Sequence, residues 1–279
     1  MDDIRWIFFD IGSTLADEEE AYRHRIRDMI RGSSVTFEQF WEKRVAYAKA
    51  GYNGDQAAIA YFGLSKTPWH SEDETPFPDA APVLEALKRR GFRLGVIANQ
   101  APGSRERLAK WDLLQYFDVI VASAEAGVDK PDPAIFRMAL EQASCRPENA
   151  IMVGDRLDND IRPAKALGMT TVRMKKGLAI YMKPACEAEV PDYTVDSLSE
   201  MQSILCTIEQ SESKVMFAPA AQVMPCLRHS DVAPFGRSDV MCSAHVPQHT
   251  SRPKGTSLAK QTSRSATRNT SFKETFFVR

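Results

Sequence analysis

An acidic side chain stands directly after a short apolar segment near the start of the chain. Residues 4–9 are largely apolar, and Asp10, Gly12, Ser13 and Thr14 follow them. This pattern predicts a buried strand that delivers Asp10 to the carboxyl edge of a sheet, where open α/β folds bind their ligands. An Asp at that position is a candidate nucleophile or metal ligand.

Other polar positions lie beside strands that we predict further along the chain. They are Asn99, after the strand at 93–97; Lys130, in the loop before the helix at 133–142; and Asp155 and Asp160, after the strand at 150–153. Parallel strands present their carboxyl ends at one edge of a sheet. We therefore expect Asp10, Lys130, Asp155 and Asp160 to surround one pocket.

These residue types suit phosphoryl transfer. Several carboxylates with few partners are costly to bury unless a cation joins them. A small set of hard oxygen ligands favours Mg²⁺, which also coordinates phosphate. Asp10 could attack phosphorus and form an aspartyl-phosphate, while Lys130 offsets the negative charge. The backbone amides of Gly12, Ser13 and Thr14 could hold the transferring oxygens.

Strands and helices alternate over most of the chain. Predicted strands cover 4–9, 93–97, 117–121, 150–153, 170–174 and 193–195, and predicted helices cover 82–90, 104–114, 133–142, 158–167 and 197–208. This alternation is typical of an α/β fold with a doubly wound, parallel, Rossmann-like sheet. We expect residues 1–15 and 80–210 to form this core.

Residues 16–79 break the alternation with helical segments only. Tyr22, Ile26 and Met29 share one helical face. Thr36 is a plausible N-cap of a second helix, and a third ends near Gly63. We expect this insert to form a small helical cap over the carboxyl edge of the sheet.

The last segment, residues 211–279, has a different composition. It holds 16 Ser or Thr residues and ten Lys or Arg against four Asp or Glu, a net charge of +6, and shows no apolar periodicity. We expect a disordered basic tail. It could contact an acidic partner or be an extension without a role.

Composition excludes some classes of function. The formal net charge of −1 gives no argument for a nucleic-acid partner or an anionic membrane. No stretch approaches the ~20 apolar residues of a membrane span, and the first apolar run is too short for a signal peptide. Five cysteines without metal-binding spacing favour a reducing compartment. We expect a cytoplasmic protein with a small phosphorylated substrate; the oligomeric state stays open.

Together these motifs resemble the haloacid dehalogenase (HAD) superfamily of hydrolases, over about residues 4–208, with a C1-type helical cap inserted after the first motif. The resemblance implies that Asp10 is both the nucleophile and a metal ligand, and that the carbonyl of Gly12 also binds Mg²⁺. Lys130 in Lys-Pro-Asp-Pro would be the family's lysine. The last motif, Gly-Asp-x(4)-Asp, matches Asp155, which would bind metal directly, and Asp160, which would bind through water.

Two positions depart from the family's pattern. The family usually has an Asp at position 12, which protonates the leaving oxygen and then activates water, and a Ser or Thr at position 98; here they are Gly12 and Ala98. Asn99 could contact phosphate or make a turn. We therefore expect a Mg²⁺-dependent phosphatase of small metabolites first, a phosphate-binding or regulatory protein with impaired catalysis as the alternative, and a metal-independent dehalogenase last.

Overall fold

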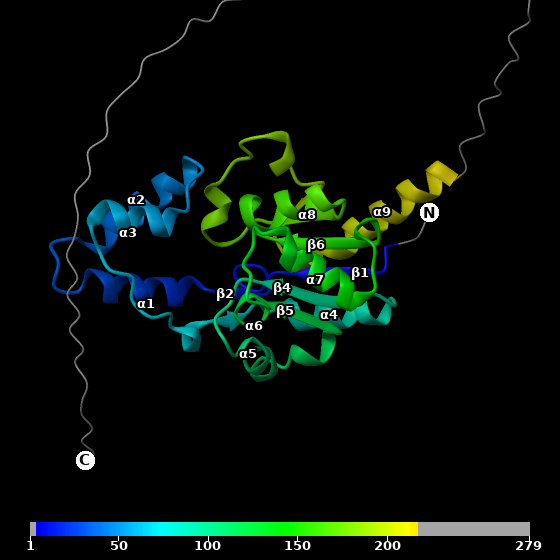
Figure 1. Ribbon diagram of the computed structural model, residues 1–279, viewed down its shortest axis with the longest axis horizontal. Coiled ribbons are helices and arrows are strands. Elements are labelled where there is room, and N and C mark those ends of the chain that lie inside the picture. The colour runs from blue at the N-terminus through cyan, green and yellow to red at the C-terminus, as the bar shows by residue number, and fades with distance from the viewer. Residues whose placement is uncertain (1–3, 217–279) are drawn as a thin grey trace, which may run out of the picture. The chain divides into compact units, whose positions relative to one another are not determined.

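Six parallel strands form the central sheet of the computed structural model, which describes residues 4–216 (Figure 1). Their order is β5-β4-β1-β6-β7-β8, with bounds β1 Trp6–Phe9, β4 Arg93–Ala98, β5 Val119–Ala122, β6 Ala150–Gly154, β7 Thr170–Met174 and β8 Tyr193–Val195. The predicted Rossmann-like α/β fold is thus confirmed. Because β1 lies between β4 and β6, the residue that follows β1 lies at the centre of the sheet edge.

Helices cover both faces of this sheet. Side chains alternate along a strand, so Ile7 and Phe9 of β1 join one apolar cluster while Trp6 and Phe8 join the other. The first cluster packs under α4 (Ala80–Arg89), α5 (Ser104–Lys110) and α9 (Met201–Met216), and the second under α7 (Pro133–Ala143) and α8 (Arg162–Leu167). Two buried layers therefore fix β1 from both sides.

The insert after β1 consists of three helices, which lie together beyond one end of the sheet (Figure 1). They are α1 (Glu19–Ile30), α2 (Phe37–Lys49) and α3 (Gly54–Phe62), packed around Ile26, Met29, Phe40 and Ala58. Thr36 caps α2 as predicted, because its side chain accepts a hydrogen bond from the Gln39 backbone amide. The Gln39 side chain in turn accepts one from the Thr36 backbone amide. The segments entering and leaving the insert pair as antiparallel β2 (Ala16–Asp17) and β3 (Thr75–Pro76).

Short helical turns fill several connections. They are α6 (Ser123–Ala126), the 3₁₀ turns η1 (Ser71–Asp73), η2 (Leu114–Tyr116), η3 (Pro147–Asn149), η5 (Gly177–Tyr181), η6 (Glu187–Glu189) and η7 (Leu198–Glu200), and the π-helical turn η4 (Leu157–Ile161). The helix predicted at 104–114 therefore ends at Lys110, and the one predicted at 158–167 begins as a π-turn.

The last helix extends past the predicted boundary of the tail. We expected helix only to residue 208, whereas α9 continues to Met216, beyond position 211. Residues 210–214 are all polar, so the apolar periodicity used to predict helices gives no signal there. The rest of the expected tail, 217–279, lies outside the described residues.

Two further features bear on the sequence-based expectations. Within residues 4–216, no helix combines the length and apolar character that crossing a bilayer requires. Cys145, Cys186 and Cys206 are free thiols in the part of the chain that the structure describes.

Candidate active site

Asp10 stands at the centre of the carboxyl edge of the sheet. Its backbone amide donates to the carbonyl oxygen of Val153 in β6 at 2.9 Å, which continues the pairing of β1 one residue past the strand. Its side chain is 13% exposed. The strand therefore holds the backbone of Asp10 rigidly and leaves its carboxylate at the mouth of the sheet.

Lys130 joins two of the predicted acidic residues. Its Nζ donates to Asp10 Oδ1 at 2.7 Å, to Asp160 Oδ1 at 2.6 Å and to the carbonyl oxygen of Ile97 at 3.0 Å. These three acceptors satisfy all three N–H bonds of a buried ammonium group. Residues far apart in the sequence thus meet as the motif spacing predicts.

Asn99 holds the backbone of Lys130 in place. Its Nδ2 donates to the Lys130 carbonyl oxygen at 2.8 Å, and its Oδ1 accepts from the Lys130 amide at 2.6 Å. The sequence left open whether Asn99 contacts phosphate or makes a turn. In the structure the side-chain amide of Asn99 binds the backbone of the loop that carries Lys130, which we call the lysine loop. Asn99 also lines the cavity beside Asp10.

The turn after β6 brings two carboxylates to the same place. Asp160 lies on η4, and its Oδ2 accepts from the Arg156 amide at 3.0 Å. A Cβ on Gly154 would lie 2.5 Å from the Asp160 side chain, so this position requires glycine. The Asp155 side chain is buried and takes part in no hydrogen bond or ion pair with the described residues. We call Asp10, Lys130, Asp155 and Asp160 the sheet-edge cluster.

The sheet-edge cluster carries more negative than positive charge. Burial raises the pKa of Asp10 to about 6, against the lowering effect of Lys130. Burial, and then the charges of Asp160 and Asp10, raise the pKa of Asp155 well above its usual value. Burial opposes the charge on Lys130, but Asp10 and Asp160 outweigh it and raise the pKa of this lysine. Burial is the first cause of both raised pKa values, and the neighbouring carboxylates add to it.

The acidic residues of this cluster fit a divalent metal ion. Asp10, Asp155 and Asp160 each offer a carboxylate oxygen, and these atoms lie within 4.8 Å of one another. Hard oxygen donors in small number suit Mg²⁺. A buried carboxylate that makes no hydrogen bond or close ion pair with the described residues, such as that of Asp155, is stabilised by a cation. Gly12, the other predicted ligand, lines the same cavity.

The turn after Asp10 meets the prediction only in part. Gly12 and Ser13 line the cavity, and Ser13 adopts a left-handed φ of 53°. Thr14 is not among the residues that line it: its side chain is enclosed and its amide donates to the Ile11 carbonyl oxygen at 3.3 Å. The tight turn thus uses the amide that we expected to hold a phosphoryl oxygen. Ala98, at the end of β4, is fully buried and offers no hydroxyl group.

Glu18 is a cavity residue that we did not single out from the sequence. It lines the cavity beside Asp10, and its Oε2 accepts a hydrogen bond from Ser13 Oγ at 3.2 Å. Removal from water, and then the charges of Asp10 and Glu74, raise the pKa of Glu18 to about 8. In the sequence it looked like one more acid at a helix start. One signal in the sequence could have led to Glu18: glycine stands at position 12, where the family usually has an Asp, so another carboxyl group could take that role.

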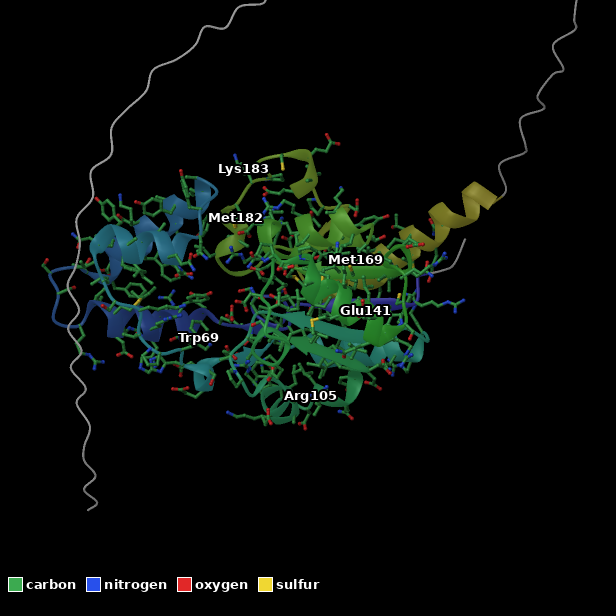
Figure 2. All side chains as sticks on the ribbon, in the orientation of Figure 1. Trp69, Arg105, Glu141, Met169, Met182 and Lys183 are labelled. Atoms are coloured by element: carbon green, nitrogen blue, oxygen red, sulfur yellow. The ribbon has the colours of Figure 1, made fainter. Side chains whose placement is uncertain are left out.

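The insert contributes the opposite wall of this cavity. Tyr22, Asn53 and Asp55 line it from the cap side. Met182, which is labelled in Figure 2, lines it from the loop after η5. Asp55 is itself fixed, because its Oδ1 accepts from Nε of the buried Arg44 at 2.6 Å. Residues of the insert and residues at the sheet edge thus line one cavity.

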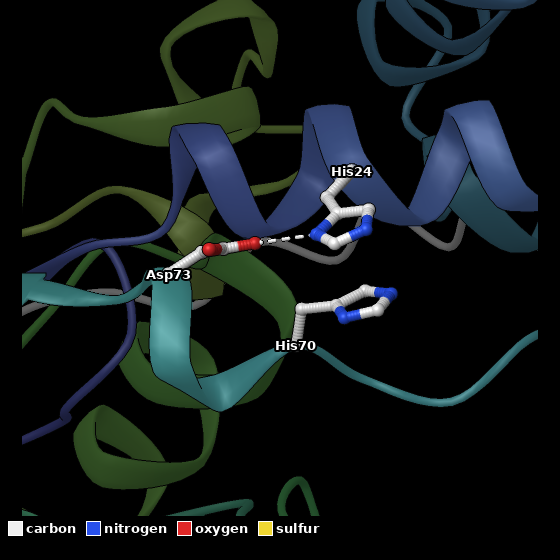
Figure 3. Close-up of side chains that lie close together, drawn as sticks. All are labelled: His24, His70 and Asp73. Carbon is white, nitrogen blue, oxygen red and sulfur yellow. Dashed lines mark hydrogen bonds and ion pairs between the residues drawn. The ribbon is translucent and has the colours of Figure 1, made fainter.

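A second polar cluster lies within the insert, away from Asp10. His24 on α1 stacks on His70 with 3.5 Å between ring centroids, and His24 Nδ1 lies 2.8 Å from Asp73 Oδ2 (Figure 3). His70 is flanked by Asp28 at 2.8 Å and Glu72 at 3.0 Å. We call these five residues the cap cluster. The two histidine rings are nearly parallel, so their nitrogen atoms lie in two separate planes. His24 is already paired with Asp73, and His70 with Asp28.

Comparisons with known proteins agree with this site. A family model described as haloacid dehalogenase-like hydrolase matches residues 4–168. A glyceraldehyde 3-phosphate phosphatase of Methanopyrus kandleri is 32% identical over 72% of this chain and 97% of its own length. A pyrimidine 5'-nucleotidase of Escherichia coli is 36% identical over 72% of this chain and 97% of its own.

A solved structure agrees as well. The crystal structure of a HAD phosphatase from Thermococcus onnurineus superposes with a TM-score of 0.51 at 25% identity, covering 72% of this chain and 97% of that one. Fold, motif geometry and sequence similarity lead to one conclusion: the chain is a hydrolase that belongs to the haloacid dehalogenase-like family.

Proposed function

We propose that this protein is a Mg²⁺-dependent phosphatase of small phosphorylated metabolites, which acts through an aspartyl-phosphate on Asp10. The observation that carries the proposal is the bridge made by Lys130, whose Nζ joins Asp10 and Asp160 in one buried cluster beside Asp155. The relatives that are named as phosphatases support the same reaction class.

Asp10 is the nucleophile in this proposal. Its carboxylate attacks phosphorus, the bond from phosphorus to the leaving oxygen breaks, and water later hydrolyses the aspartyl-phosphate. The hydrogen bond from Lys130 to Oδ1 fixes the rotamer of Asp10. The same ammonium group offsets the charge of a phosphate that arrives beside three carboxylates. Asn99 contributes by fixing the backbone of Lys130, so that the Lys130 ammonium group stays beside Asp10.

The remaining acidic residues serve the metal ion. Asp10, Asp155 and the carbonyl group of Gly12 would hold Mg²⁺, and Asp160 contributes its charge and positions Lys130. When bound, Mg²⁺ supplies positive charge that stabilises the transferring phosphoryl oxygens. Gly12 and Ser13 lie where their amides can face the same oxygens.

The test compares wild-type protein with Asp10→Asn. Both are offered p-nitrophenyl phosphate and acetyl phosphate, with and without Mg²⁺, and phosphate release is measured. We expect metal-dependent release by the wild type and a loss on the order of 10⁴-fold or more in the variant, because the nucleophile is removed. Asp132→Asn, at the N-cap of α7, is the matched control and should keep its activity.

Two other outcomes would change the assignment. If phosphate is not released but beryllofluoride binds in a Mg²⁺-dependent way, the protein is a phosphate-binding or regulatory member of the family, as the absence of side chains at Gly12 and of a hydroxyl group at Ala98 would allow. Halide release from a haloacid without metal would instead indicate a dehalogenase.

A further inference from the structure

A carboxyl group occupies the space that a side chain on residue 12 would enter. A Cβ built on Gly12 would lie 2.4 Å from Glu18 Oε1, 2.6 Å from its Cδ and 2.7 Å from its Oε2. Real Cβ atoms do not approach other atoms so closely. The carboxyl end of Glu18 therefore occupies space beside Asp10 that the glycine at position 12 leaves open.

The local structure directs Glu18 into this space. Glu18 precedes α1 directly, at the N-cap position, yet its side chain makes no capping hydrogen bond to the helix. Instead it is turned toward the Asp10 turn, where Ser13 Oγ donates to Oε2 at 3.2 Å. The next two residues, Glu19 and Glu20, are exposed. The direction of Glu18 thus differs from that of its acidic neighbours.

Folding alone does not account for this placement. Glu18 lies close to the carboxylates of Asp10 and Asp155, and burying like charges together is unfavourable. An exposed glutamate at a helix N-terminus would avoid that cost and would interact favourably with the helix dipole.

The other carboxyl groups in this cavity have assigned partners. Asp55 is bound by Arg44, and Asp160 is bound by Lys130. Asp155 is the proposed metal ligand. Within the described residues that line this cavity, Glu18 is therefore the carboxyl group available to exchange a proton with substrate or water.

We propose that Glu18 is the general acid and base of this enzyme and supplies from the cap junction the carboxyl group that position 12 lacks. This inference rests on the proposed phosphatase function. In the first step Asp10 attacks phosphorus, the bond to the leaving oxygen breaks, and the Glu18 carboxylic acid gives its proton to that oxygen. In the second step Glu18 carboxylate takes a proton from water, which attacks phosphorus, and the bond to Asp10 breaks to release phosphate.

The first experiment varies the leaving group. Full-length wild type, Glu18→Gln and Glu20→Gln are assayed with p-nitrophenyl phosphate and phenyl phosphate in Mg²⁺. Phenolate needs a proton more than p-nitrophenolate does, so kcat/KM of Glu18→Gln should fall about 10²-fold to 10⁴-fold on phenyl phosphate and much less on p-nitrophenyl phosphate. Glu20→Gln, an exposed neighbour, should match the wild type on both esters.

The second readout follows the intermediate. Because Glu18 also activates water, Glu18→Gln should accumulate aspartyl-phosphate, seen as a burst of p-nitrophenol and as acid-trapped phosphoprotein. A purely structural role would lower activity on both esters equally, without a burst. That result would overturn the proposal, and the ratio between esters remains informative even when part of the variant is unfolded.

The third experiment moves the carboxyl group. Gly12→Asp alone should lower turnover, because the new Cβ would collide with Glu18. Gly12→Asp combined with Glu18→Ala removes the collision and should exceed the activity of Glu18→Ala. No gain in the double variant would count against the proposal.

Different results would overturn the proposed phosphatase function and the role of Glu18. Wild-type protein that releases no phosphate from either ester in Mg²⁺ would overturn the proposed function together with the role of Glu18. Active wild type with an unchanged Glu18→Gln variant would overturn the role of Glu18 alone.

Discussion

The sheet-edge cluster and the cap cluster are both dense groups of titratable side chains, but their charges are balanced differently. In the cap cluster each histidine has a carboxylate beside it, and the pKa of His70 is raised, first by its hydrogen bond to Glu72 and then by Asp28. In the sheet-edge cluster one ammonium group binds two of three buried carboxylates, those of Asp10 and Asp160, and the pKa values of Asp10 and Asp155 are raised.

This difference in charge balance suggests that the cap cluster has a structural role and the sheet-edge cluster a chemical one. Hydrogen bonds and ion pairs in the cap cluster tie α1 to the loop around η1, and each histidine has at least one carboxylate within 3.0 Å. The sheet-edge cluster keeps its imbalance because β1, η4 and the lysine loop hold its members together against their repulsion. Such an imbalance at a cavity is typical of a site that awaits a cation and an anionic substrate.

Lys130→Met should give the largest loss of stability in this comparison. The change leaves Asp10 and Asp160 buried without their cation, and removal of one partner from a buried pair costs about 3 kcal/mol or more. Urea unfolding at neutral pH measures the loss. Lys88→Met, which breaks the more exposed pair with Asp118, should cost less than about 1 kcal/mol. Equal losses would mean that the buried bridge contributes no more than a surface pair.

Mg²⁺ should stabilise the protein through the sheet-edge cluster and not through the cap cluster. A ligand at about a hundred times its Kd stabilises the folded state by about 2.7 kcal/mol, which a thermal melt detects without any substrate. Asp155→Asn should abolish most of this shift, whereas Asp73→Asn should keep it. A shift that survives Asp155→Asn and disappears in Asp73→Asn would reverse the assignment of the two clusters.

His70→Gln should give the smallest loss of stability, and the size of this loss depends on pH. The folded-state pKa of His70 lies above the usual 6.5, so its protonated form contributes stability that is fully present below about 6.5 and is lost as pH rises through the folded-state value. The hydrogen bond to His70 lowers the pKa of Asp28, which keeps that partner ionised.

The measurement is the difference in unfolding free energy between wild type and His70→Gln, taken below pH 6.5 and again above the folded-state pKa of His70. It should shrink toward alkaline pH. The Lys88→Met difference should stay constant over the same range and serves as the control. A His70→Gln difference that grows with pH would show that the ring is held neutral.

Sequence patterns located the sheet-edge cluster because its members follow buried strands at fixed distances. Asp10 and Asp155 directly follow β1 and β6, and the Lys-Pro-Asp-Pro segment precedes α7. Parallel topology then brings these positions together whatever the packing of individual side chains. The alternation of strands and helices predicted the layers for the same reason.

The direction of single side chains was not available from the sequence. Glu18 lines the cavity beside Asp10, where its side chain bonds Ser13 and occupies space that a Cβ on Gly12 would enter. Likewise, the amide group of Asn99 binds the backbone of Lys130, a contact between loops that no local pattern encodes. Such contacts depend on tertiary distances of a few ångströms.

The antiparallel pair of β2 and β3 carries both crossings of the chain between core and cap. Glu18 is the first residue beyond β2, so it lies at the junction between the core and the three cap helices. A movement of the cap that admits substrate would withdraw this carboxyl group from Asp10, and the return movement would bring it back. Closure of the cap over the substrate and placement of the Glu18 proton donor would then occur in one conformational change.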